Sequence, residues 1–340
     1  MTVTPPVTPS VPLPSTPSVP PSTPRSAAPE GRHADPASNR DPATLRADLA
    51  DHGYLADATT ATVASLALAL GRPILAEGPP GTGKTQLATS LAEVTGRRLL
   101  RLQCHEELDE ARTSYEWDYG RQMLATQLVR PQLDATLGGL GADELFEATA
   151  DLERFFFSDR FLVERPLLAA VRATEPVLLL VDEVDRSDES FEALLLEVLG
   201  EQQITIPELG TLTARQPIVA VITSNDSREL SDALRRRCLR LGFSYPDADR
   251  EAEIIDAQVP GVAEALRRSV VGFLAELRGL GLRKPPGISE SIDWARALLV
   301  VHADRLEADV VRSTMGIIVK HAADETLLLS HLDRLVAAST

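Results

Sequence analysis

Residues 78–85 read Gly78-Pro79-Pro80-Gly81-Thr82-Gly83-Lys84-Thr85. This stretch matches the pattern G-x-x-x-x-G-K-[ST], the loop that wraps the phosphates of a nucleotide. A short apolar run over 73–76 precedes it, and a helical pattern over 86–92 follows it. That order of strand, glycine loop and helix distinguishes a phosphate-binding loop from a glycine turn that happens to precede a lysine. The stretch therefore predicts a nucleotide site on an α/β fold.

Each part of this loop has a chemical task. Its glycines allow the main chain to approach the phosphates, so that backbone N–H groups bind them. The helix that begins here directs the positive end of its dipole at the same anions. We expect Lys84 to reach the β and γ phosphates and Thr85 to bind Mg²⁺ through its hydroxyl. The sequence thus predicts that residues 78–85 bind ATP with Mg²⁺.

A second motif follows later in the chain. Residues 177–181 form a continuous apolar run, typical of a parallel strand buried on both faces, and the run ends in Asp182 and Glu183. We expect Asp182 to hold Mg²⁺ and Glu183 to orient the water that attacks the γ-phosphate. Apolar runs that end in acids are common, but one that follows a phosphate loop at this distance indicates hydrolysis. For Asp185, Arg186 and Asp188 the sequence leaves open a role in the site or a solvated loop.

Asn225 ends another apolar run, over 218–224. An asparagine there can hydrogen-bond the γ-phosphate or the attacking water, or it can simply form a turn. Its position after the acidic pair favours the first interpretation.

Arginines 235–237 precede Cys238 at the end of a short helical segment. They offset the acidic surface or the helix dipole, or one of them is an arginine finger that stabilises charge on the transferring phosphoryl group. A finger supplied in trans requires a neighbouring subunit, and hence a ring or a filament. The candidates are Arg236 and Arg237.

The wider pattern alternates strands and helices, as in a parallel sheet covered on both faces. Helical periodicity starts near Asp41, and the region after Asp247 is wholly helical. We predict a Pro/Ser/Thr-rich tail over 1–40, an α/β nucleotide-binding domain over 41–245 and a small all-α lid domain over 246–340. The first domain contains an insertion over about 104–175 and a β-hairpin over 202–214. The predicted strands are 72–77, 98–103, 176–181, 217–223 and 238–242, and the predicted helices include 84–95, 188–199, 247–257, 260–278, 288–301 and 304–320.

Composition restricts the setting. The chain has 340 residues and a net charge of -16, which argues against broad binding to nucleic-acid backbones. Its two cysteines, Cys104 and Cys238, predict buried thiols in a reducing compartment. The sequence shows neither a secretory signal pattern nor an apolar run of membrane-spanning length, so we expect a cytoplasmic protein that does not bind membranes. The tail over 1–40 is either a solvated polyproline-rich segment or a docking tail.

The insertion concentrates aromatic residues. It holds Tyr115, Trp117 and Tyr119 and four phenylalanines at 155–157 and 161. These side chains pack the insertion onto the core, or they form a surface that grips a partner or lines a central pore.

The region from about 42 to 335 resembles the MoxR family of AAA+ ATPases. Within that family it is most similar to the CoxD-like subgroup, which is linked to maturation of carbon monoxide dehydrogenase. The loop and the acidic pair are shared by very many ATPases, whereas the 115–119 segment and the hairpin are more specific. The matching segments are 53–57 (GYLAD), 78–85 (GPPGTGKT), 102–104 (LQC), 115–119 (YEWDY), 181–186 (VDEVDR), 204–210, 223–225 (TSN) and 233–238 (ALRRRC).

The resemblance implies several roles. Asn225 would be the sensor-1 residue, and Arg237 would be the arginine finger, with Arg236 as the second candidate. Tyr54 and Leu55 would lie against the adenine. Family members form ATP-dependent hexameric rings that act as chaperones in the assembly of metalloenzymes and other complexes. A partner with a von Willebrand factor A domain often accompanies them.

The chain departs from the family pattern at one place. Many relatives carry a sensor-2 arginine at the start of a lid helix, but residues 286–294 contain no arginine. Arg296 lies further along, and it either substitutes for the missing residue or is an ordinary surface arginine.

Three functions remain in competition. The first is ATP hydrolysis that drives chaperone-like remodelling of a protein client. The second is a nucleic-acid-stimulated motor, against which the acidic charge counts. The third is a nucleotide-gated assembly scaffold with little turnover, which the intact acidic pair disfavours and the missing sensor-2 arginine keeps open.

Overall fold

The computed structural model describes residues 40–106, 114–137, 141 and 152–339. The predicted tail over 1–40 lies outside the described residues except for Arg40, and so does part of the predicted insertion.

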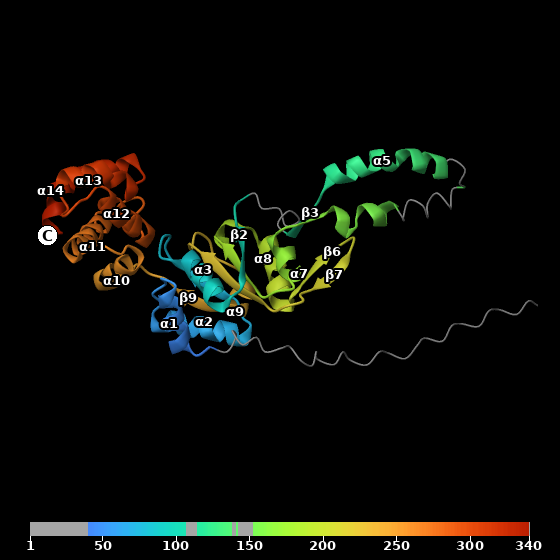
Figure 1. The fold of residues 1–340 in the computed structure, drawn as a ribbon, viewed down its shortest axis with the longest axis horizontal. Coiled ribbons are helices and arrows are strands. Elements are labelled where there is room, and N and C mark those ends of the chain that lie inside the picture. The colour runs from blue at the N-terminus through green and yellow to red at the C-terminus, as the bar shows by residue number, and fades with distance from the viewer. Residues whose placement is uncertain (1–39, 107–113, 138–140, 142–151, 340) are drawn as a thin grey trace, which may run out of the picture. The chain divides into compact units, whose positions relative to one another are not determined.

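A five-stranded parallel sheet forms the centre of the fold, with the order β2-β5-β8-β1-β9 (Figure 1). Strand β5 pairs with β2 on one side and β8 on the other, and β1 pairs with β8 and β9. The prediction of a parallel sheet is confirmed, with strand ends within one or two residues of the expected ones. The strands are β1 (Ile74–Glu77), β2 (Arg98–Gln103), β5 (Val177–Asp182), β8 (Ile218–Ser224) and β9 (Leu239–Gly242).

Helices cover both faces of this sheet because its central strands, β1, β5 and β8, are buried on both sides. In β5, Leu178 and Leu180 pack toward one face, whereas Leu179 and Val181 pack toward the other, and all are fully buried. Each such burial contributes about 1.5–3 kcal/mol to stability. The first face is covered by α1 (Pro42–Asp51), α2 (Ala58–Leu70) and α3 (Lys84–Thr95), and the second by α7 (Pro166–Arg172), α8 (Glu189–Leu196) and α9 (Asp232–Arg237).

Polar caps and glycines set the ends of these helices. Asp57 caps α2 by accepting from the N–H of Thr60, and Asp188 caps α8 by accepting from the N–H of Phe191. Asp188 is therefore a helix cap. The helix predicted over 188–199 ends at Leu196 and continues as a π turn over Glu197–Glu201.

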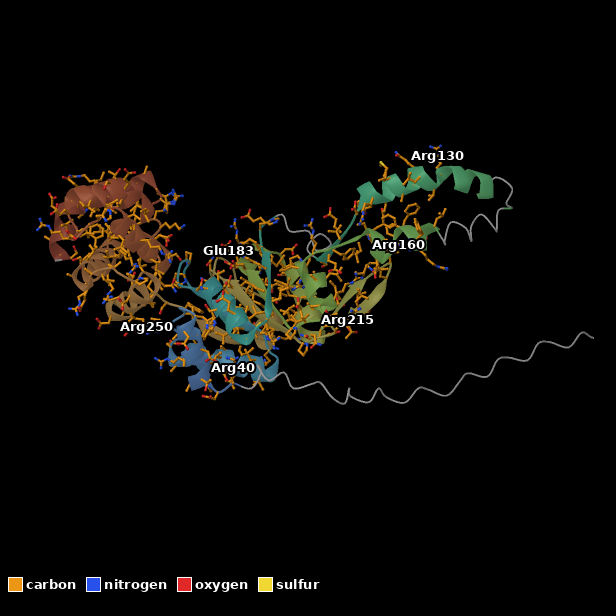
Figure 2. All side chains as sticks on the ribbon, viewed as in Figure 1. Arg40, Arg130, Arg160, Glu183, Arg215 and Arg250 are labelled. Carbon is orange, nitrogen blue, oxygen red and sulfur yellow. The ribbon has the colours of Figure 1, made fainter. Side chains whose placement is uncertain are left out.

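The insertion builds on a two-stranded antiparallel sheet, in which β3 (Tyr115–Trp117) pairs with β4 (Leu162–Glu164). Trp117 packs edge-on against Phe157, with ring centroids 5.2 Å apart, and Phe161 is buried. Packing thus accounts for these rings, but Tyr119 is exposed at the start of α5 (Tyr119–Leu137), the helix on which Figure 2 labels Arg130. The predicted hairpin forms as β6 (Gln203–Ile206) and β7 (Gly210–Thr213).

The region after β9 is helical, as predicted, and has its own apolar core. Phe273 and Trp294 lie at its centre, with ring centroids 5.1 Å apart. The helix predicted over 304–320 is wrong in extent, because α13 gives way to a 3-10 turn over Met315–Ile317 that contains a glycine. The last helix, α14, was not predicted. The helices are α10 (Ala248–Gln258), α11 (Glu264–Arg278), α12 (Ile288–Val300), α13 (Ala308–Thr314) and α14 (Ala322–Ala338).

Both cysteines are buried and unbridged, and burial raises the pKa of each thiol to about 12. Over the part of the chain that the structure describes, every helix is too short or too polar to span a bilayer.

Candidate nucleotide site

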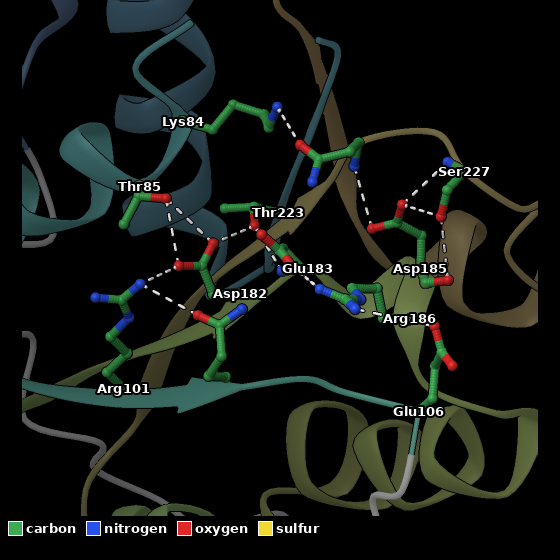
Figure 3. A network of polar contacts seen from close by, with 12 residues as sticks. Lys84, Thr85, Arg101, Glu106, Asp182, Glu183, Asp185, Arg186, Thr223 and Ser227 are labelled. Atoms are coloured by element: carbon green, nitrogen blue, oxygen red, sulfur yellow. Dashed lines mark hydrogen bonds and ion pairs between the residues drawn. The ribbon is translucent and has the colours of Figure 1, made fainter. Parts of the chain in front are cut away.

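Three neighbouring strands deliver polar residues to one edge of the sheet. The loop over 78–85 follows β1, Asp182 and Glu183 end β5, and Asn225 follows β8. Because the strands are parallel neighbours, their carboxyl ends meet, which is where ligands bind in open α/β sheets. Figure 3 shows the resulting network of polar contacts.

The glycines of the loop are required by its backbone. Gly78, Gly81 and Gly83 have φ values of 147°, 74° and 92°, a region that other residues rarely adopt. A Cβ at Gly78 would lie 2.2 Å from the carbonyl oxygen of Phe243. Gly83 precedes α3, so the first N–H groups of that helix remain free to face phosphates. The cradle therefore fits a polyphosphate chain.

Lys84 lies at the centre of the site. Its Nζ donates to the carbonyl oxygens of Gly78 and Pro79, at 2.6 and 2.7 Å, and to Oδ1 of Asn225 at 3.0 Å. Burial lowers the pKa of this ammonium, an effect that the carboxylates of residues 185, 182 and 183 oppose. The start of α3 and the end of β8 thus bring the lysine and the asparagine into direct contact.

Asp182 meets a hydroxyl from the loop. Thr85 Oγ1 donates to Asp182 Oδ1 at 3.1 Å, and Thr223 Oγ1 donates to the same oxygen at 2.6 Å. Arg101 donates to the other carboxylate oxygen at 2.6 Å. A hydroxyl beside a carboxylate suits Mg²⁺, which binds oxygen ligands and relies on one or two protein groups plus phosphates. The residues present therefore fit a magnesium–nucleotide complex.

Glu183 adopts a left-handed backbone conformation, with φ of 57°. Such a conformation is unusual outside glycine and clusters at functional sites. The N–H of Glu183 donates to Thr223 Oγ1 at 2.9 Å, which fixes its main chain, and its carboxylate forms an ion pair with Arg186 at 3.1 Å. Arg186 also lies 3.9 Å from Glu106. The Glu183 carboxylate is thus separate from the Asp182–Thr85 pair.

Asp185 has a structural role, which the sequence left open. It is 4% exposed and accepts hydrogen bonds from the N–H groups of Asn225 and Ser227 and from the Ser227 hydroxyl. Burial raises the pKa of Asp185, but the hydrogen bonds outweigh burial and hold the pKa below its ordinary value. Asp185 therefore fixes the backbone that presents Asn225 to Lys84.

Replacing Asp185 with asparagine tests this anchor. An amide keeps the size but directs N–H donors at a backbone N–H, so we expect a loss of about 1–3 kcal/mol of stability and a clear fall in ATP turnover. Because its folded-state pKa is lowered, Asp185 adds stability that is lost as the pH falls through that pKa. The unfolding free energy of Asp185→Asn should therefore fall less than that of the native protein between about pH 7 and pH 3. Denaturant titrations at several pH values measure these free energies. The same pH dependence in the two proteins would contradict the assignment.

A cavity of about 770 Å³ lies beside the loop. Tyr54 and Leu55 line it together with Thr82 and Gly83, as expected if they contact the adenine. Burial raises the pKa of the Tyr54 phenol, and Arg250, labelled in Figure 2, donates to the carbonyl oxygen of Leu55 at 2.7 Å. The segment over 53–57 is thus firmly held.

The start of α12 contacts the loop through the main chain. The N–H of Ile288 donates to the carbonyl oxygen of Gly81 at 2.8 Å, and a Cβ at Gly287 would lie 2.8 Å from the same oxygen. Arg296 lines the cavity, although its side chain is half-exposed and paired with Asp293 at 3.4 Å.

Arg236 and Arg237 lie away from this network. Both are exposed, and neither lines the cavity over its described walls. Arg237 packs over Gly200, where a Cβ would lie 1.4 Å from its Nη1, and that nitrogen is 3.5 Å from the carbonyl oxygen of Leu196. The fold thus leaves both guanidinium groups on the outside of the subunit.

Two contributors to the site, Thr223 and Arg101, were not identified as individual residues in the sequence, and the role of Asp185 was left open. Thr223 is hidden in an apolar strand, and only its place two residues before Asn225 signals a role. Arg101 lies on a strand whose burial is uneven, and Asp185 looks like a loop acid. Their partners come from other strands, so no local pattern identifies them.

Known proteins provide an independent comparison. Residues 73–238 match the family model of the AAA domain, dynein-related subfamily. The chain is 23% identical over 292 residues to protein NorQ of Paracoccus denitrificans (strain Pd 1222), which covers 84% of this chain and 93% of NorQ. It is 24% identical over 254 residues to an uncharacterized protein of Staphylococcus aureus (strain USA300), with 73% and 83% of the two chains covered.

Among solved structures, the chain is similar to the Thermotoga maritima RuvB Holliday junction branch migration motor. The TM-score is 0.44 at 19% identity, and the match covers 76% of this chain and 67% of that one. The region that matches the family model contains the phosphate loop and most of the parallel sheet. Residues 73–238 are therefore an AAA domain, and the chain is an ATPase with the P-loop AAA+ fold and a distant relative of NorQ.

Proposed function

We propose that the chain hydrolyses ATP with Mg²⁺ to remodel or mature a protein complex, as a ring-forming member of the MoxR family with a CoxD-like role. One observation carries the catalytic part: the Lys84–Asn225 hydrogen bond and the Thr85–Asp182 hydrogen bond, beside Glu183, lie at the carboxyl ends of three neighbouring strands. Arg101 forms an ion pair with Asp182, and Arg186 forms one with Glu183, so each carboxylate charge has a nearby cation.

The roles follow from the contacts. When bound, Mg²⁺ neutralises phosphate charge, and Asp182 and Thr85 would hold it. Lys84 would exchange its bonds to the carbonyl oxygens of Gly78 and Pro79 for phosphate oxygens, and Asn225 would bind the γ-phosphate or the water. Glu183 would orient that water and accept its proton on a carboxylate oxygen.

An exposed Arg237 is suited to reach the nucleotide of a neighbour, and Arg236 is the second candidate. We therefore propose a ring of identical subunits, with six as the number that the family resemblance implies.

The client is proposed to be a protein. Helix α5 exposes the side chains of Tyr119, Met123, Leu124 and Leu128, each by more than half. Apolar patches of this kind mark protein-binding surfaces, whereas a net charge of -16 opposes a nucleic-acid backbone. The proposed setting is the cytoplasm, with a partner carrying a von Willebrand factor A domain.

The client can be captured on a stalled ATPase. With ATP and Mg²⁺, tagged Glu183→Gln protein should retain a client from lysate of its own cells, since blocked hydrolysis prolongs engagement. Combining Glu183→Gln with Met123→Ser and Leu128→Ser should reduce the captured amount about tenfold or more, because these two side chains form the proposed contact. Mass spectrometry of the retained proteins gives the measurement.

The matched control is Lys84→Ala, which has the same α5 but cannot bind ATP. Equal capture by that variant, or capture that survives the α5 substitutions, would contradict an ATP-gated client site there. Turnover that rises only with added DNA or RNA would instead favour a nucleic-acid motor, and absence of turnover in the native chain would favour a scaffold.

A further inference from the structure

Strand β1 is linked at its amino end to the segment that carries the candidate arginine fingers. Arg72, two residues before β1, donates from Nη2 to the carbonyl oxygens of Arg236 and Cys238, at 2.6 and 3.2 Å. Its Nε donates to the carbonyl oxygen of Arg237 at 3.1 Å. One guanidinium thus binds three consecutive main-chain carbonyls.

These carbonyls need a partner. The last four C=O groups of a helix accept no hydrogen bond from within it. Because α9 is only six residues long, most of its C=O groups are in this position. A planar guanidinium with donors in a fixed fork can satisfy several of them at once, which a lysine cannot. Arg72 therefore caps the carboxyl end of α9 and fixes the position of the Arg237 main chain.

The carboxyl end of the same strand makes a second contact. Glu77 is 5% exposed and lies between Arg235 and Arg240, with ion-pair distances of 3.1 and 2.5 Å. Glu77 directly precedes the phosphate loop. Arg235 and Arg240, which flank the candidate fingers in sequence, thus form ion pairs with the last residue of β1, the strand that leads into the phosphate loop.

Strand pairing adds main-chain bonds along this line. The N–H of Leu239 donates to the carbonyl oxygen of Pro73 at 2.8 Å, and the N–H of Phe243 donates to that of Glu77 at 2.7 Å. The side chain of Arg237 stays exposed, so the surrounding contacts hold its backbone rather than its guanidinium.

We propose that Arg72 is a positioning residue for the arginine finger, with Glu77 as the second anchor. This inference rests on the proposed function, since it requires that Arg237 act on the nucleotide of the neighbouring subunit. A displacement of about 1 Å at a reacting group can lower the rate a hundredfold. Arg72 would therefore affect hydrolysis in the neighbour, while its own subunit keeps a complete ATP site.

Replacing Arg72 with alanine should lower kcat by about ten- to a hundredfold and leave ATP affinity within about twofold. Arg72→Lys, which keeps the charge and part of the donor set, should give an intermediate kcat, and it serves as the test if the alanine variant does not fold. Arg305→Ala, which removes an exposed arginine paired with Glu307, should turn over as the native protein does.

Mixing distinguishes a displaced finger from a damaged site. Lys84→Ala subunits cannot hydrolyse ATP but carry an intact finger segment. Added to Arg72→Ala subunits, which carry an intact loop, they should raise turnover per Arg72→Ala subunit at least severalfold. A mixture with no more turnover than the separate proteins would overturn the inference, as would native kcat in Arg72→Ala.

The failure of this inference is distinguishable from failure of the proposed function. Arg237→Ala is measured in parallel. If Arg237→Ala keeps native turnover, the finger assignment itself fails. If Arg237→Ala is inactive while Arg72→Ala is fully active, only the positioning role of Arg72 is wrong.

Discussion

Glu183→Gln should bind ATP with nearly native affinity and hydrolyse it about a hundred to ten thousand times more slowly. The amide keeps the size of the side chain and can still interact with water, but it cannot accept the proton that the attacking water releases. The loop, Lys84 and the Asp182–Thr85 pair remain intact, so binding should not change. Isothermal calorimetry and a phosphate-release assay measure the two quantities on the same preparation.

The structure adds a further expectation for this variant. Loss of the carboxylate also removes the ion pair with Arg186, which lies 3.1 Å away on the exposed side of the site. Surface pairs of this kind contribute little, about 0–1 kcal/mol, so the melting temperature should hardly change. Glu189→Gln, an exposed change of the same type at the start of α8, is the control and should turn over normally. Native turnover in Glu183→Gln would exclude it as the base.

The central fold was predictable because its signals are local. The run over 177–181 is apolar without interruption, and a run this short with an acidic pair at its end is typical of a strand buried on both faces. The glycine loop then identifies which strand is β1, and a lysine at its end fixes the start of α3 to the residue. Helices and strands of this kind are specified by side chains within a few positions of each other.

The C-terminal region was harder for the opposite reason. Its helices are specified by packing around Trp294, whose Nε1 donates to Thr314 Oγ1 at 2.9 Å from another helix. Where α13 ends depends on that packing more than on its own sequence. The periodic pattern continued past the true end, so the prediction was too long.

The residues of the site also differ in whether their role follows from neighbours in sequence or from distant contacts. Residues whose chemistry resides in a contiguous motif, such as Lys84 and Asp182, were predictable. Residues that act on the main chain of a distant segment were harder to assign. The role of Asp185, which holds Asn225 across 40 positions, stayed open, and Arg72, which binds the carbonyl oxygen of Arg237 across 165 positions, was not identified. A side chain that recognises backbone carries no sequence signature in its partner.

Arg237→Ala should lower kcat by about a thousandfold or more, the effect typical of an arginine finger, and leave the affinity for ATP unchanged. The reason is spatial. Arg237 is exposed and does not line the cavity in its own subunit, so ATP can bind without it. Arg236→Ala should have a smaller effect, since that side chain reaches only Asp232, at 4.0 Å, among the described residues. If Arg236→Ala proves the more damaging, the finger is Arg236.

Mixing two variants tests the proposal further, because the proposed finger and the site that it would serve belong to different subunits. Arg237→Ala subunits keep Lys84 and Glu183, whereas Lys84→Ala subunits keep the finger. In a randomly mixed ring of equal parts, about a quarter of the interfaces combine an intact site with an intact finger, so a mixture of two inactive proteins should recover about a quarter of native turnover. Recovery that falls as the rings are diluted into subunits would locate the active site at the interface. A mixture that stays inactive under conditions where mixed rings form would show that Arg237 serves its own nucleotide or none.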